Sequence, residues 1–152
     1  MLLAEALAHR ADLNARMSQL AARAVSNARL QEGDAPVEDP AALLDQHLRL
    51  ADELAELITR INVTNIGVQV QPGLTMTAAL ARRDRLRTLH RVRTAVADAA
   101  SQRQDRFTRS EIKFIPAVDV GGLRSAADDV ARELRELDTR IQEVNWTSEL
   151  QQ

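Results

Sequence analysis

The hydrophobic residues of this 152-residue chain recur at alternating steps of three and four over much of its length. The most regular run lies between Val120 and Val144, where Arg, Glu and Asp fill most of the positions in between. Its members are Val120, Leu123, Ala127, Val130, Leu134, Leu137, Ile141 and Val144. Such a seam is typical of a helix that packs lengthwise on another helix. The pattern predicts a helix over about 120–145, with Asp119 as its N-cap.

A similar seam opens the chain and predicts a helix over about 2–29. Its members are Leu3, Ala6, Arg10, Leu13, Met17, Leu20, Ala24 and Asn27. The loop "QEGDAPVEDP" ends this helix, because its Gly and Pro residues oppose helical structure. Asp39 as N-cap and Pro40 as first residue then start a second helix over about 40–64. The seam expected for this second helix is Leu44, His47, Ala51, Leu54, Ile58 and Ile61.

Four polar residues stand on or at the end of these two seams: Arg10, Asn27, Asn62 and Asn65. Polar residues at such positions fix the register and the oligomeric state of packed helices, at a cost in stability. Alternatively, they are exposed where the helices diverge. The sequence leaves both interpretations open.

The β-like part of the chain begins after the second helix, with extended segments expected over about 66–74 and 108–118. Ile66, Val68 and Val70 alternate with polar or small residues, and Pro72-Gly73 suits the centre of a type II turn. We expect the two segments to pair as a ribbon that directs these three side chains toward the helix ends. A third helix over about 76–101 would follow, capped by Thr75 or Thr77.

The predicted fold is a single, mainly α domain over residues 1–152, an antiparallel bundle of about four long helices with a small two-stranded β ribbon at one end. Hydrophobic residues make up 45% of the chain and charged residues 28%, which disfavours disorder. No uninterrupted apolar run approaches the roughly 18–20 residues of a membrane helix. The first residues carry Glu5 and no basic segment, unlike a signal peptide, so we expect a cytoplasmic protein that does not contact membranes.

Residues for catalysis or metal binding form no recognisable pattern. The chain has no Cys, and its three His residues occur without a Glu-x-x-His or His-x-x-x-His spacing. We therefore predict no catalytic residue, no metal and no cofactor. The net charge of −2 and the scattered arginines of the third helix disfavour nucleic acid as a partner. These arginines would instead pair with Asp45, Asp52, Glu53 and Glu56 of the second helix and orient the two helices.

Several stretches together resemble a septicolysin-like family of small bacterial proteins. They are "AEALAHRADL", "QEGDAPVEDP", "LITRINVTN", "ARRDRLR", "TRSEIKF" and "RELDTRIQEVNW", which span nearly the whole chain. The resemblance implies a mostly helical protein with no assigned catalytic residues. The name of the family implies membrane damage, but this chain lacks a long amphipathic hairpin and a Trp-rich tip.

The seams favour a non-enzymatic helical structural or interaction protein that self-associates as a homo-oligomer, with the seams packing either within one chain or between chains. The alternative is a binding protein or enzyme for a small anionic ligand, held at the end of the bundle by Arg109, Glu111 and Lys113.

The one Trp of the chain, Trp146, follows the last predicted helix. Asn145 suits the left-handed position after a helix that ends near Val144, which would fold Trp146 back onto the last turn. Leu150 would supply a second apolar anchor. We therefore predict that this tail docks, either on its own bundle or on a neighbouring subunit.

Overall fold

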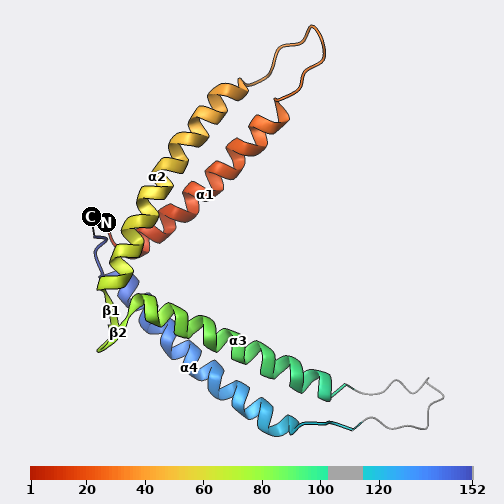
Figure 1. Cartoon of the computed structure of the whole chain (residues 1–152), viewed down its shortest axis with the longest axis vertical. Coiled ribbons are helices and arrows are strands. Elements are labelled where there is room, and N and C mark those ends of the chain that lie inside the picture. The colour runs from red at the N-terminus through yellow and green to blue at the C-terminus, as the bar shows by residue number, and fades with distance from the viewer. Residues whose placement is uncertain (103–114, 152) are drawn as a thin grey trace, which may run out of the picture. The chain divides into compact units, whose positions relative to one another are not determined.

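The computed structural model describes residues 1–102 and 115–151. In this part of the chain four long helices and one small sheet make up the regular structure (Figure 1). The elements are α1 (Leu3–Ser26), α2 (Pro40–Gly67), β1 (Gln69–Gln71), β2 (Leu74–Thr75), α3 (Met76–Ala100) and α4 (Val120–Thr147). The predicted mainly α fold, with four long helices and a two-stranded ribbon, is confirmed.

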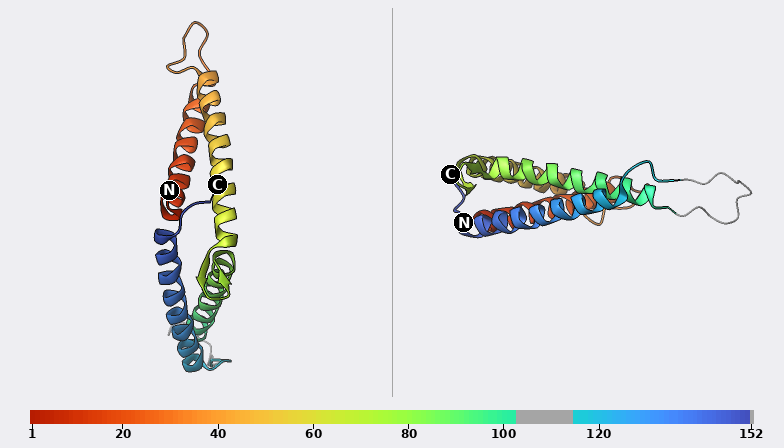
Figure 2. Two further views of the ribbon diagram at one scale, coloured as in Figure 1. Left: turned by 90° about the vertical axis from the view of Figure 1, so that its left-hand side faces the viewer. Right: turned by 90° about the horizontal axis from the view of Figure 1, so that it is seen from below.

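Packing divides the chain into two compact units. The first comprises Met1–Gln69 and Gln142–Gln152, and the second comprises Val70–Ile141. In the first unit α1 and α2 run side by side and antiparallel, joined by the loop over 27–39 (Figure 2). In the second unit α3 and α4 form another antiparallel pair. The structure thus places two units within the single domain that the sequence predicts.

The helix starts follow from local capping chemistry. Asp39 Oδ1 accepts a hydrogen bond from the Ala41 N–H at 2.9 Å, and Pro40 occupies the first helical position of α2. Thr75 caps α3 by accepting from the N–H of Ala78 at 3.2 Å. Asp119 accepts from the N–H of Gly122 at 3.0 Å and so caps α4. The predicted caps are confirmed, with Thr75 rather than Thr77 at the start of α3.

The core of the first unit lies between α1 and α2. The predicted seam of α1 is the face that packs inward, since Leu3, Ala6, Leu13, Leu20 and Ala24 are buried. Arg10 is the exposed exception on this face.

The predicted seam of α2 was partly wrong. Leu44 and Ile58 were expected inside, but their side chains are 59% and 37% exposed. The residues that face α1 begin one position earlier and form a buried or half-buried series: Leu43, His47, Leu50, Leu54, Leu57, Ile61 and Thr64. We call this series the inner face of α2.

An ion pair ties the interhelical loop to α1. The guanidinium of Arg23 donates to Glu38 through two nitrogens, with Nε 2.9 Å from Oε2. This hydrogen bonding lowers the pKa of the Glu38 carboxyl below its ordinary value of 4.5. The contribution of the pair is therefore present above about pH 4.5 and is lost as the pH falls through the lowered pKa.

The second unit combines an apolar interior with ion pairs at its surface. The α4 seam faces inward, with Ala127, Val130, Leu137 and Ile141 buried, and so packs within the chain. Arginines of α3 reach across to α4, as follows. Arg82 Nε lies 3.1 Å from Glu133 Oε1, an Arg87 nitrogen lies 3.6 Å from Asp138 Oδ2, and Arg93 donates to the carbonyl of Ala126 at 3.0 Å. The predicted pairing with carboxylates of the second helix was wrong, because the partners of these arginines lie on α4.

The β ribbon is a hairpin made of neighbouring residues. Strand β1 pairs with β2, and Gly73 in the turn between them has a φ of 78°, which suits the third position of a type II turn. The predicted pairing of Ile66–Val70 with Ile112–Val118 was wrong, since Ile66 belongs to α2 and is exposed. Of the expected second segment, residues 108–114 lie outside the described residues.

Burial singles out Val70 as the apolar anchor of the hairpin, since its side chain is buried whereas that of Val68 is half-buried. Val70→Asp should lower the free energy of unfolding by about 2–4 kcal/mol, because it buries an unpaired charge. Urea denaturation followed by circular dichroism measures this loss. Val68→Asp is the matched control and should cost clearly less. A larger loss for Val68→Asp than for Val70→Asp would contradict the assignment.

Candidate functional site

The predicted ligand-binding residues Arg109, Glu111 and Lys113 lie outside the described residues. The binding site for a small anionic ligand at the end of the bundle therefore stays a prediction. In the described part of the chain, no group of three or more His, Asp or Glu side chains is arranged to hold a metal ion. His9 instead links the two helices of the first unit, with Nε2 2.9 Å from Glu53 Oε1.

The end of α4 differs from the sequence prediction. The helix continues to Thr147, so Asn145 is a buried helical residue and does not adopt the left-handed conformation. Trp146 is 61% exposed, whereas Leu150 is only 8% exposed. Within the chain, therefore, Leu150 is the anchor of the tail and Trp146 is not. A role for Trp146 at a subunit interface stays a prediction.

The tail after α4 is held against the start of α1. The N–H of Leu3 donates to the carbonyl of Ser148 at 2.9 Å, and the N–H of Leu150 donates to the carbonyl of Met1 at 2.9 Å. These bonds flank an antiparallel bridge between Leu2 and Glu149. We call this arrangement the terminal clasp.

The terminal clasp also involves the C-terminal part of α2. The hydroxyl of Thr64, which is fully buried, accepts a hydrogen bond from the N–H of Gln151 at 2.9 Å. Arg60 Nε donates to the carbonyl of Gln151 at 3.1 Å. These bonds hold the backbone of the exposed Gln151 against α2. The clasp is therefore a structural element of the first unit.

The surface of α2 carries a second apolar series, displaced by one residue from the inner face. Its members are Leu44, Leu48, Ala51, Ala55, Ile58, Asn62 and Asn65, and we call it the outer face of α2. One residue corresponds to about 100° around a helix, so the two faces point in clearly different directions. Leu44 and Leu48 are 59% and 60% exposed, and nothing in the described part of the chain covers them.

The outer face continues into an apolar groove beside α1. This groove has a volume of about 320 Å³ and is lined by Ala21, Ala24, Val25, Ala28, Pro40, Leu44 and His47. Val25 at its edge is 76% exposed. Loose Leu, Ile and Val side chains are ordinary on a surface, but a contiguous stripe of them marks an interaction site. The outer face and its groove form the candidate functional site.

Three residues of this site, Leu44, Ala51 and Ile58, were predicted from the sequence to lie in the interior. Its other apolar residues Leu48, Ala55 and Val25 were not predicted. The available signal was the doubled pattern of α2, in which Leu43-Leu44 and Leu57-Ile58 are adjacent pairs. A helix that buries a single apolar stripe carries polar residues on its other side. Adjacent pairs of large apolar residues therefore indicate a second apolar face.

The family of the chain follows from a sequence profile. The profile of a family of unknown function (DUF6847) matches residues 10–150. The chain belongs to this family. The match includes most of α1 and the whole of α2, α3 and α4, and thus the outer face of α2. Of the terminal clasp, it leaves out Gln151 and the first three residues of the chain.

A solved structure is similar over the whole chain. It is the crystal structure of a functionally unknown conserved protein from Corynebacterium diphtheriae, with 40% sequence identity and a TM-score of 0.94. The alignment covers 99% of each chain. None of the curated proteins searched matches this chain. Among the described residues, no helix is both long and apolar enough to cross a bilayer.

The contrast between Leu150 and Trp146 gives a test of the terminal clasp. Leu150→Ala should lower the free energy of unfolding by about 2 kcal/mol, because it leaves a cavity beneath the tail. Trp146→Ala should change it by less than about 0.5 kcal/mol in the monomer, since the indole is mostly exposed. Chemical denaturation at low protein concentration measures both values. Equal losses would contradict the docking of Leu150.

Proposed function

We propose that this is a non-enzymatic helical interaction protein that self-associates through the outer face of α2, with a second copy of the chain as the partner. The observation that carries the proposal is the exposure of Leu44, Leu48 and Ile58 on a helix that already buries its inner face against α1. The α4 seam, which first suggested association, is used within the chain and no longer supports it.

The spacing of the outer face fits helix-to-helix packing. Leu44, Leu48, Ala51, Ala55, Ile58 and Asn62 alternate steps of four and three, which is the repeat that lets side chains of one helix enter the gaps of another. The stripe is about 27 Å long at 1.5 Å per residue. Ala51 and Ala55 at its middle would allow two helices to approach closely. The same stripe on two copies is self-complementary across a two-fold axis, the commonest symmetry of soluble oligomers.

The energy of burial suggests a reversible dimer. Covering a half-exposed Leu or Ile is worth roughly 1–2 kcal/mol, so the three large side chains from each copy contribute about 6–12 kcal/mol. The Val25 side chain and the apolar groove add to this. Association costs about 4–15 kcal/mol before any contact is counted. The two sums are of similar size, which favours a dimer that forms at micromolar concentrations over an obligate one.

In this proposal, Asn62 sets the register in which the two copies of α2 pack. It is exposed on the outer face, in line with Ile58, where a polar side chain weakens packing but restricts register. Of the two interpretations of the seam asparagines, the proposal adopts register control for Asn62.

Sedimentation velocity over about 1–100 µM protein tests the proposal. Wild type should shift from the monomer mass to twice that mass as its concentration rises. Leu48→Glu should remain monomeric over the same range, because dimerisation would bury the new carboxylates without partners. Since Leu48 is exposed, the substitution should leave the circular dichroism spectrum unchanged.

Val63→Glu is the matched control, because Val63 is an exposed aliphatic residue of the same helix that lies off the outer face. It should dimerise like wild type. A wild-type protein that stays monomeric at 100 µM, or a Leu48→Glu variant that dimerises equally well, would overturn the proposal.

A further inference from the structure

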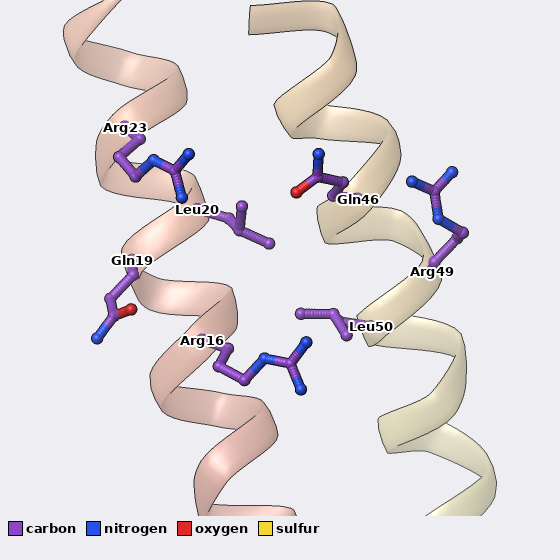
Figure 3. A pocket seen from close by; sticks show the side chains of 7 residues that line it. All are labelled: Arg16, Gln19, Leu20, Arg23, Gln46, Arg49 and Leu50. Carbon is purple, nitrogen blue, oxygen red and sulfur yellow. The ribbon is translucent and has the colours of Figure 1, made fainter. Parts of the chain in front are cut away.

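A second groove lies between α1 and α2, and it is arginine-rich (Figure 3). It has a volume of about 320 Å³ and lies within the first unit. The lining residues are Arg16, Gln19, Leu20 and Arg23 from α1, and Gln46, Arg49 and Leu50 from α2. Arg16, Leu20, Gln46 and Leu50 point into the space between the two helices. The side chains of Gln19 and Arg49 point away from this space and lie at its edges. Arg16 and Gln46 thus stand beside an apolar floor of Leu20 and Leu50, and no carboxylate lines the groove.

The hydrogen-bonding capacity of this lining is largely unused. In the described part of the chain, the side chains of Gln19, Gln46 and Arg49 make no hydrogen bond or ion pair with other residues. Arg16 has only a distant partner, with a nitrogen 3.6 Å from Oδ2 of the exposed Asp12. Arg23 is the exception, because Glu38 holds its guanidinium.

Three arginines of α3 behave differently. On α3, Arg82, Arg83 and Arg87 each lie within 4.0 Å of a carboxylate oxygen on α4. Those arginines hold helices together. Arg49 has no such role in the fold, and the fold makes little use of Arg16, so both guanidinium groups are available to a ligand that supplies negative charge.

We propose that this groove binds a small multivalent oxyanion, a phosphorylated or polycarboxylate molecule with a compact organic part. Planar guanidinium groups bind phosphate and carboxylate oxygens in a forked geometry. Arg16 would hold one charged group, and the exposed Arg49 side chain would turn toward the groove to hold another. The Gln46 amide would donate a further hydrogen bond. Leu20 and Leu50 would contact the organic part. The groove volume is within the range of small-molecule sites.

The test uses the full chain and two probes, sodium pyrophosphate and sodium citrate, at constant ionic strength against sodium chloride. Isothermal titration calorimetry should detect binding of at least one probe, and the same probe should raise the melting temperature. Preference for pyrophosphate would assign a phosphorylated ligand, and preference for citrate a polycarboxylate. The double variant Arg16→Gln/Arg49→Gln should weaken binding at least tenfold.

Arg85→Gln is the matched control, since Arg85 is an exposed arginine of α3 and forms no ion pair with the described residues. It should bind like wild type. If the double variant unfolds, Gln46→Glu replaces it, because a carboxylate in the groove should abolish binding without removing any arginine. The absence of binding by both probes, or equal binding by wild type and the groove variants, would overturn the proposal whatever the oligomeric state.

Discussion

The packing of the inner face of α2 is the constraint on which the first unit depends. Leu43, Leu57 and Ile61 cover α1, and Thr64 on the same face receives the backbone of the C-terminal tail. Because this single face serves both partners, it fixes the rotation of α2 about its own axis. That rotation in turn places the next residues around the helix, Leu44, Leu48 and Ile58, in solvent. The exposure of this stripe is therefore a consequence of the burial of the inner face against α1 and the C-terminal tail.

The two units differ in what holds their helices together. In the first, leucines and alanines form the interior, and arginines remain available at the surface, as Arg49 does. In the second, Arg82, Arg87 and Arg93 bind carboxylates and a carbonyl of α4. The proposed interactions with a second copy and with an anion both concern the α1–α2 pair. The two surfaces lie on different sides of this pair, so each can be removed by substitution without the other.

Much of the fold could be predicted from the sequence, because α1 and α4 each carry one apolar stripe and the stripe can only be the buried one. For α2 the sequence does not determine which stripe is buried, because two stripes one residue apart are similarly apolar. Only the packing of α2 against α1 decides which of them lies inside. The hairpin partner of Val70 was mispredicted because a pairing of neighbouring residues across Pro72-Gly73 competes with a distant one. Trp146 was misplaced because Asn145, well suited to end a helix, is buried within it instead. The sites were the least predictable part, since the arginine-rich groove forms only when α1 and α2 meet.

The claim that α2 has one face for its own chain and one for a second copy can be tested directly by disulfide trapping, because the chain contains no Cys. Ala55 lies at the middle of the outer face, which runs from Leu44 to Asn65, so it meets its own counterpart whether two copies associate in parallel or antiparallel. An Ala55→Cys variant, oxidised mildly at a concentration of about 50 µM, should form a covalent dimer far faster than a Val63→Cys variant. Equal rates of cross-linking for the two variants, or no cross-linking of Ala55→Cys, would contradict the account.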